Sequence, residues 1–290
     1  MRRFEYFAPE SVDEAVSLLQ ERGDGVKLLA GGTDLLVQMK EAGLHPPAIV
    51  SLHAIDGLRG IEAQNGGLRI GAGTEMIEIA AHEVVRDSYT ALAEGAGLVG
   101  SVQTQNMATI GGNIANAAPS ADTPPPLAVF DAEAEITGPN GSRRLPVAEM
   151  FDGPGSTTFA SDEVLVAVHL PAQPARTGSV YQRHTPRKIM DIAAVGVAVK
   201  LSLAADGEVI DSAAICLGAV GPTIFRAEEA EQALAGQPAS VELFDNAAAL
   251  AQAAASPISD VRGSAEFRRY LVGVMTRRCL KIAHERAKSN

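Results

Sequence analysis

Two glycine pairs are the features of this sequence best suited to bind a ligand. They lie in the runs Leu29-Ala30-Gly31-Gly32-Thr33-Asp34-Leu35 and Thr109-Ile110-Gly111-Gly112-Asn113. Consecutive glycines let neighbouring backbone amides point into one concavity and remove the side chains that would block a diphosphate. Either pair alone is typical of an ordinary tight turn. The two together, each with polar neighbours, favour amides from both turns converging on one diphosphate.

Charge and cysteine content narrow the chemistry further. The formal net charge is -11, and Lys and Arg are scattered except near the carboxyl end, so nucleic acid is not an expected partner. A bound phosphate would be held mainly by backbone N–H groups and hydroxyls. Cys216 and Cys279 are too few for an iron–sulfur cluster and too far apart to suggest a zinc site. The histidines show no metal-ligating spacing, and no hydrolase or P-loop motif occurs. We therefore assign no catalytic residue and no metal ligand.

Asp122 is a further candidate with two possible roles. Its carboxylate could accept hydrogen bonds from sugar hydroxyls, or it could cap a helix that begins at Pro124. Gly95, Gly97 and Gly100 match the G-x-G-x-x-G dinucleotide pattern literally. That pattern requires a preceding strand, whereas this run follows a helical stretch, so we interpret these glycines as a helix end.

The elements that would position these residues form three groups. The first, residues 1–57, has a capped helix starting at Ser11, strands at 26–30 and 48–52, and a helix at 35–39. The second, residues 58–176, has strands at 68–73, 134–137 and 162–171, helices at 77–85, 88–96 and from 124 on, and a segment at 99–123 without sustained periodicity, which is typical of a functional loop.

The third group, residues 177–290, follows a Pro/Ala/Thr/Gly-rich stretch. Strands are predicted at 181–183, 193–204 and 208–220, with a hairpin turn at Asp206-Gly207, and helices at 226–234, 241–255 and 264–287. The chain is thus of the α+β class. It has neither an amino-terminal secretory pattern nor an apolar run of the roughly 18–20 residues that span a membrane, so a cytoplasmic protein without a membrane span is expected.

Three pieces of the sequence are similar to one known family. AGGTDLL (30–36), VGSVQTQNMATIGGNIANAAPSADTPP (99–125) and YQRHTPRKIMDIAAVGVAV (181–199) resemble the FAD-binding medium subunits of molybdenum hydroxylases of the xanthine dehydrogenase and carbon monoxide dehydrogenase type. The resemblance spans nearly the whole chain. It implies a PCMH or vanillyl-alcohol-oxidase type of fold, with two α/β lobes that bind FAD and a carboxyl-terminal domain of a three-stranded antiparallel sheet with helices.

The resemblance also implies roles for single residues. Ala30 to Asp34, flanked by Leu29 and Leu35, and Thr109 to Asn113 would surround the FAD pyrophosphate. Asn116 and Asp122 would bind the ribityl and flavin region, and Leu165 would pack near the isoalloxazine ring. Arg183 stands where relatives often have Lys, which keeps the charge but removes a titrating group. Gln105 stands where they often have Arg.

Arg183, Arg187 and Lys188 surround His184 in the sequence. Such a basic cluster is either a surface patch or the source of a cation that stabilises a reduced, anionic flavin. Which of Arg183 and Lys188 would be nearest the flavin is left open at this point.

The implied function is electron transfer. A large subunit would carry the molybdenum cofactor and a small subunit the [2Fe-2S] clusters, in a heterotrimer or a dimer of heterotrimers, and FAD in this chain would pass the electrons to NAD, a quinone, a cytochrome or oxygen. The alternatives are a stand-alone flavin-dependent oxidase of the same fold, for which the sequence offers no base, and a flavin-free scaffold subunit.

Overall fold

The amino-terminal lobe is a small parallel sheet with two helices. The computed structural model describes residues 2–290. In this lobe the strand order is β1-β3-β2, and its elements are β1 (Glu5–Phe7), α1 (Val12–Arg22), β2 (Lys27–Leu29), α2 (Leu35–Glu41) and β3 (Ala48–Ser51). Ser11 caps α1 by accepting from the Glu14 amide at 3.2 Å, as the sequence predicts. The turn between β2 and α2 is the first glycine motif.

The second lobe is a five-stranded antiparallel sheet covered by short helices. Its strand order is β4-β5-β10-β6-β7, with bounds β4 (Ile61–Gln64), β5 (Gly67–Gly71), β6 (Glu133–Gly138), β7 (Gly141–Pro146) and β10 (Val164–Leu170). The helices are α3 (Met76–Ala81), α4 (Glu83–Ser88), α5 (Thr90–Leu98), α6 (Val102–Gln105), α7 (Ile110–Ala115) and α8 (Pro124–Val129). Two 3-10 turns, η1 (Asp56–Leu58) and η2 (Val147–Glu149), and a small hairpin of β8 (Phe151–Gly153) and β9 (Ser156–Thr157) complete it.

Two predictions in this lobe are wrong in detail. The segment at 99–123 is not without regular structure, because Ser101 and Thr109 cap the short helices α6 and α7. Helices of four and six residues are too short to give a helical period, which is why the pattern missed them. The single helix expected at 77–85 is broken at His82, whose extended backbone ends α3 and starts α4. The break lets Ile79 and Val85 both be fully buried.

The carboxyl-terminal domain is an antiparallel sheet with helices on one face. The sheet has four strands rather than the three expected: β11 (Thr177–His184), β12 (Val195–Leu203), β13 (Ile210–Gly218) and β14 (Phe225–Arg226). A strand of two residues is too short to be recognised from a pattern of alternation. The helices are α9 (Glu228–Leu234), α10 (Val241–Ala254) and α11 (Ala265–Ser289).

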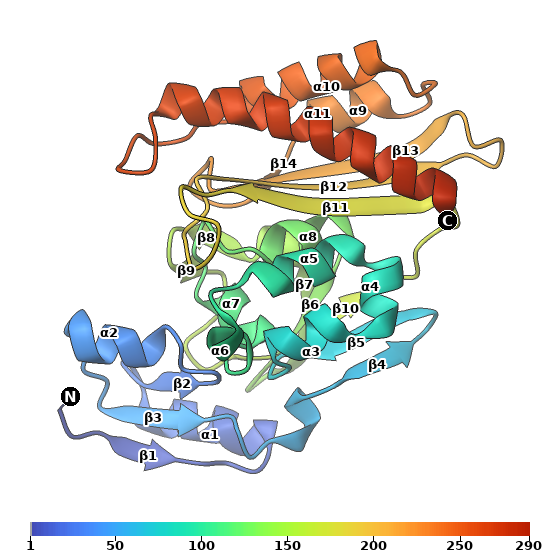
Figure 1. Ribbon diagram of the computed structural model, residues 1–290. Helices are drawn as coiled ribbons and strands as arrows, with labels where there is room; N and C mark the ends of the chain where they lie inside the picture. Colours follow the sequence, from blue (N-terminus) through green and yellow to red (C-terminus); the bar gives the residue numbers. More distant parts are fainter. Residues whose placement is uncertain (1) are drawn as a thin grey trace.

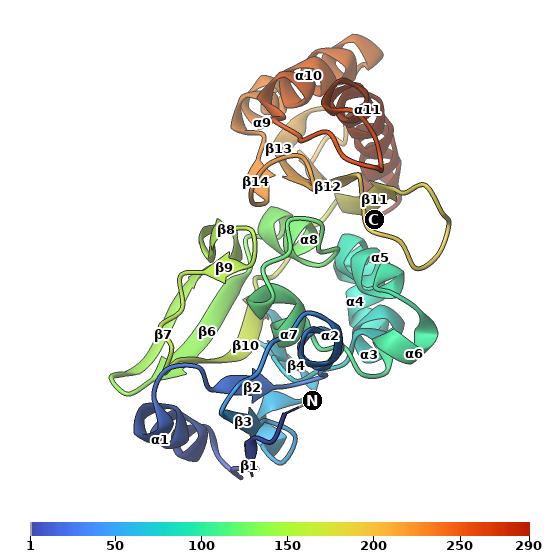
Figure 2. The same cartoon turned by 90° about the vertical axis from the view of Figure 1, so that its left-hand side faces the viewer.

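This sheet is buried on both faces. Larger side chains of β12 face the helices of the domain, and small ones face the second lobe. Val197 and Val199 of β12 pack among the helices α9 to α11, whereas Ala198 between them faces the second lobe, together with Ala214 and Cys216 of β13. Side chains of a strand alternate between faces, so a run that is apolar throughout indicates a strand buried on both sides. The small residues let α5 and α8 approach the sheet closely, as Figures 1 and 2 show.

Ion pairs fasten the carboxyl-terminal domain to the second lobe. Arg226 of β14 donates to the Glu231 carboxylate at 2.5 Å, to Asp131 at 2.9 Å and to the Ala128 carbonyl at the end of α8 at 3.0 Å. On the opposite side, Glu94 of α5 accepts from Arg286 of α11 and from the Tyr181 amide, each at 2.7 Å. The second lobe and this domain are therefore held together at both edges of the carboxyl-terminal sheet.

Substitution of Arg226 by Met is expected to lower the free energy of unfolding by about 2 kcal/mol, because it leaves the largely buried Glu231 carboxylate without its cation. Denaturant unfolding followed by circular dichroism measures this. Arg277→Met is the matched control: the Arg277–Asp245 pair is 45% and 48% exposed, so its loss should cost at most about 1 kcal/mol. Equal losses for the two variants would contradict the expectation.

No helix within residues 2–290 combines the length and the apolar character that crossing a membrane requires. The same part of the chain gathers no group of three or more His, Cys, Asp or Glu side chains that could hold a metal ion.

Candidate cofactor site

The two glycine motifs are neighbours in space. A Cβ atom at Gly31 would lie 1.9 Å from the Met107 carbonyl oxygen and 2.9 Å from the Ala108 Cα atom. These residues immediately precede Thr109, which caps α7. Figures 1 and 2 both place α2, which follows the first motif, near α7. Gly31 is therefore required for close approach of the two backbones, and this contact joins the first lobe to the second.

The first motif presents unused backbone donors. Gly32 has a left-handed φ of 70°, and its carbonyl accepts from the Leu36 amide, which begins the α2 hydrogen-bond ladder. Within residues 2–290, the five amides of Gly31 to Leu35 donate to no protein acceptor. Asp34 is exposed and the other four residues are half-buried, and amides shielded from water are normally paired. Five consecutive free donors in a turn that begins with two glycines fit a diphosphate.

The second motif differs from the expectation, because its amides are already engaged. Ile110 donates to the Thr74 carbonyl, Gly111 to the Ala72 carbonyl at 2.8 Å, and Gly112 to the Thr109 hydroxyl at 3.1 Å. A Cβ atom at Gly111 would lie 2.7 Å from Ala72. The second glycine pair thus lets α7 pack against the end of β5, and what it offers a ligand is side chains at its end, not free amides.

Polar side chains continue from α7 toward the carboxyl-terminal sheet. The Thr123 hydroxyl donates to the Asn113 side-chain oxygen at 2.7 Å, which ties the loop before α8 to the second motif. Asn116 ends α7 as its C-cap and is half-buried. Leu165 is 6% exposed on β10, the strand against which α7 packs. Asn113, Asn116, Thr123 and Leu165 thus lie on or around α7, and we refer to these four side chains below as the track.

Asp122 lies at the end of this track and is bound by β11. Its carboxylate accepts from the Tyr181 hydroxyl at 2.8 Å and from the Arg183 guanidinium. The Asp122 and Arg183 side chains are only 7% and 6% exposed. Burial raises the pKa of the Asp122 carboxyl to about 6, against the opposing charge of Arg183 and the hydrogen bonds from Tyr181 and Arg183. The alternative role as a helix cap is wrong, because the N-cap of α8 is Thr123 and the Asp122 carboxylate is bound by Tyr181 and Arg183 instead.

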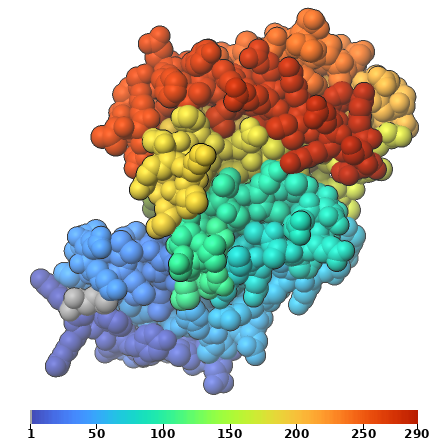
Figure 3. Space-filling model, in the orientation of Figure 1, coloured from blue at the N-terminus to red at the C-terminus, as the bar shows by residue number. Residues whose placement is uncertain are grey.

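The basic cluster read from the sequence is divided by the fold. Arg183 is buried against Asp122, whereas Arg187 is exposed and pairs with Asp191 in the loop between β11 and β12. Lys188 is exposed in the same loop, which stands out between the carboxyl-terminal domain and α6 in Figure 3. His184 packs edge-on against Phe267, with ring centroids 5.9 Å apart. Arg183 is accordingly the cation that is connected to the track, through Asp122.

Two other sequence features have structural roles. Gln105 is 7% exposed and donates to the Gly97 carbonyl at 2.8 Å. Gly95 lies within α5, where a Cβ atom would be 2.5 Å from the Asp122 carbonyl oxygen. The interpretation of the G-x-G-x-x-G match as a helix end is confirmed, because Gly97 lies in the last turn of α5 and Gly100 lies beyond it.

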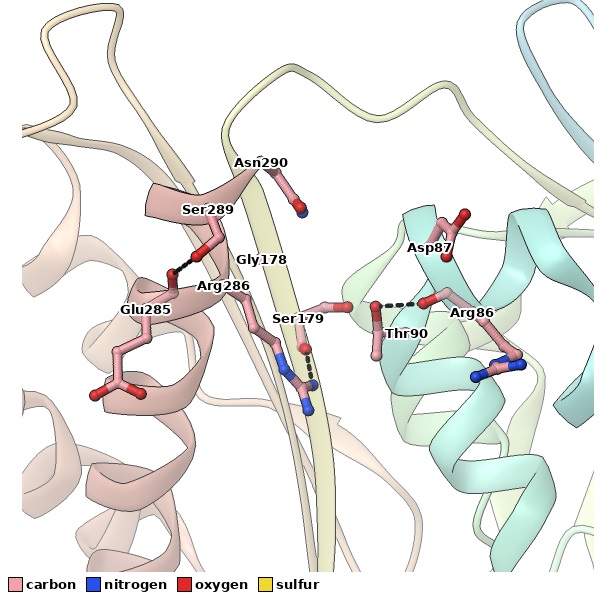
Figure 4. A pocket seen from close by; sticks show the side chains of 9 residues that line it. All are labelled: Arg86, Asp87, Thr90, Gly178, Ser179, Glu285, Arg286, Ser289 and Asn290. Atoms are coloured by element: carbon pink, nitrogen blue, oxygen red, sulfur yellow. Dashed lines mark hydrogen bonds between the residues drawn. The ribbon is translucent and has the colours of Figure 1, made fainter.

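A polar hollow elsewhere on the molecule contains none of the candidate residues. It lies between α4, the start of α5 and the end of α11, and Figure 4 shows Arg86, Thr90 and Arg286 among its lining residues. Its polar groups largely bind each other: the Thr90 hydroxyl donates to the Arg86 carbonyl, and Arg286 donates to the Ser179 carbonyl. The hollow marks the seam between the second lobe and the carboxyl-terminal domain.

Comparisons with known proteins agree along the whole chain. Residues 2–173 match the family described as "FAD binding domain in molybdopterin dehydrogenase", and residues 181–283 match "CO dehydrogenase flavoprotein C-terminal domain". The xanthine dehydrogenase FAD-binding subunit of Escherichia coli O157:H7 is 34% identical over 280 residues, 96% of this chain and 95% of the relative. The carbon monoxide dehydrogenase medium chain of Hydrogenophaga pseudoflava is 36% identical over 284 residues, 98% of each.

A solved structure of this type of subunit also matches the chain over nearly its whole length. It is a carbon monoxide dehydrogenase from Hydrogenophaga pseudoflava that lacks the Mo-pyranopterin moiety of the molybdenum cofactor. The matching chain is 38% identical, covers 98% of both chains and superimposes with a TM-score of 0.94. Fold, sequence and family matches extend over both lobes and the carboxyl-terminal domain. The chain therefore belongs to the family of FAD-binding medium subunits of the xanthine dehydrogenase and carbon monoxide dehydrogenase type of molybdenum hydroxylase.

Proposed function

We propose that this chain is the electron-transfer subunit of a heteromeric molybdenum hydroxylase. Substrate hydroxylation takes place at a molybdenum cofactor in a large subunit, and this chain passes the electrons from the [2Fe-2S] clusters of a small subunit to an external acceptor. FAD, when bound, supplies redox chemistry that no side chain of the protein provides. The residues of the chain bind the cofactor, orient it and set its electrostatic surroundings.

The observation that supports this proposal most directly is the row of free amides from Gly31 to Leu35 beside α7. The chain has a net charge of -11 and no cluster of Lys or Arg in either glycine motif, so backbone donors of this kind are what a pyrophosphate would need there. Asn113, Asn116 and the Asp122–Arg183 pair follow from there toward the flavin end, and Leu165 supplies an apolar contact.

Similarity to relatives with different substrates supports placing the substrate site in another subunit. One relative is named for xanthine and another for carbon monoxide, yet this chain is 34% and 36% identical to them. A chain that held the substrate pocket would be expected to resemble one of them more. The proposed assembly is a heterotrimer or a dimer of heterotrimers with the large and small subunits.

The purified chain is expected to be yellow, with a flavin absorption band at about 450 nm and one FAD per chain. Purified from its native host, it should carry molybdenum and iron in proportion to FAD, because the other subunits accompany it, whereas the chain expressed alone should carry neither metal. Metal analysis and FAD content measure both.

Two outcomes would point elsewhere. Oxidation of a small molecule by the chain alone would favour a stand-alone flavin oxidase. A colourless chain that takes up no added FAD would favour a scaffold subunit.

A further inference from the structure

Tyr181 connects the carboxyl-terminal sheet to the cofactor site. Tyr181 and Arg183 are two residues apart on β11 and therefore point from the same face of the sheet. Both end on the carboxylate of Asp122. Tyr181 is 3% exposed, and burial together with the Asp122 charge holds the pKa of its hydroxyl well above the usual range. The hydroxyl is thus a permanent donor aimed at one carboxylate oxygen.

The neighbouring strand is shaped to leave room for this hydroxyl. Gly196 of β12 is paired in register with Arg183, and a Cβ atom there would lie 2.8 Å from the Tyr181 hydroxyl oxygen. The Tyr181 amide is in turn fixed by the Glu94 carboxylate. Backbone and side chain of Tyr181 are both held in place, so the direction of its hydroxyl is set by the fold.

We propose that Tyr181 is a positioning residue for the flavin end of the site: by donating to Asp122 it keeps this carboxylate ionised and fixed against Arg183, and so sets the charge that the bound flavin experiences. The inference rests on the proposed function. Asp122 is next to Thr123, which binds Asn113 of the second glycine motif, so the triad of Asp122, Tyr181 and Arg183 is connected to that motif.

The sign of the effect follows from the charges around Asp122. The ionisable groups that contact it are Tyr181 and Arg183. Cys216 of β13 lies beyond Tyr181, and burial raises the pKa of its thiol to about 12, so it remains neutral. Glu94 of α5 reaches the triad only through the Tyr181 amide and is paired with Arg286.

Loss of the Tyr181 hydroxyl removes a donor that lowers the pKa of Asp122. The carboxyl group then takes up a proton at higher pH, and the charge of Arg183 is left uncompensated. A more positive site favours electron uptake by the flavin, so its reduction potential rises.

The test measures the midpoint potential of FAD bound to the full chain, by spectroelectrochemistry, over about pH 5 to 8. Tyr181→Phe is compared with the wild type, with Asp122→Asn and with Tyr89→Phe. Tyr89 is a matched control, because it is a 2% exposed tyrosine whose hydroxyl donates to the Pro171 carbonyl instead of to Asp122. FAD content and circular dichroism are recorded for each variant.

We expect the potential of Asp122→Asn to be more positive than that of the wild type at neutral pH and to lack the inflection due to Asp122. In Tyr181→Phe this inflection should move up by about one pH unit, as expected for loss of one hydrogen bond to a charged group. Tyr89→Phe should follow the wild-type curve.

The inference would be overturned if the Tyr181→Phe variant binds FAD and its midpoint potential equals that of the wild type at every pH. The proposed function would then remain intact. If Tyr181→Phe fails to fold, an Asp122→Asn curve identical to that of the wild type would overturn the inference equally. Failure of the wild-type chain to bind FAD would instead count against the proposed function.

Discussion

Replacement of Gly31 by Ala is expected to abolish tight FAD binding. The new Cβ atom would lie 1.9 Å from the Met107 carbonyl oxygen and 2.9 Å from the Ala108 Cα atom. Both are backbone atoms that cannot move aside as a flexible side chain can. Either the turn with the free amides or the segment that leads into α7 must shift, so the two motifs no longer form one site. FAD can then bind only by forcing the displaced turn back against this overpacking, and a cost of about 3 kcal/mol lowers the affinity by about 100-fold.

A fluorescence titration of the chain with FAD measures this loss. Gly57→Ala is the matched control within the first part of the chain, because no atom lies within 4 Å of the new Cβ atom and the backbone at Gly57 is not left-handed. It should bind FAD as the wild type does, with a change in stability of about 0.5 kcal/mol or less. Wild-type affinity in Gly31→Ala would show that the contact between the two glycine motifs is not needed for binding.

The features that the sequence predicts well are those governed by residues close together in the chain. Ser11 and Glu14 form the expected cap of α1, and Asp206 accepts from the Glu208 amide in the expected turn between β12 and β13. The three helices after residue 226 also begin and end near the expected positions. In each case the stabilising contact lies within a few residues, where propensity and capping rules apply.

What the sequence could not predict depends on distant partners. Both motifs are Gly-Gly pairs in the sequence, yet the amides of one are free and those of the other are engaged, and only the approach of β5 to α7 distinguishes them. Tyr181 was missed as a site residue because its partner Asp122 is 59 residues away. The one available signal was a tyrosine two residues before Arg183 on the same strand, a spacing that puts both side chains on one face of the sheet.

Replacing either Asp122 or Arg183 alone is expected to lower the free energy of unfolding strongly, and replacing both is expected to lower it much less. Asp122→Ala leaves a guanidinium that is 6% exposed without a counter-ion, and Arg183→Met leaves the carboxylate alone; each should lower the free energy of unfolding by about 3 kcal/mol near neutral pH. The double variant buries no charge at this point. We expect the double variant to lose at least about 2 kcal/mol less unfolding free energy than the two single variants lose together.

The pH dependence gives this cycle a second, independent readout. The pKa of Asp122 is raised to about 6 from 3.8, so the folded chain binds this proton more tightly than the unfolded chain. The stability contributed by this carboxyl is therefore present at low pH and is lost as pH rises through about 6. Without Arg183 the carboxyl is still harder to ionise, so Arg183→Met should lie close to wild type at about pH 5 and fall further behind it by about pH 8. Denaturant unfolding of the four proteins at both pH values measures this, and additive losses that do not change with pH would mean that the two side chains do not act as a pair.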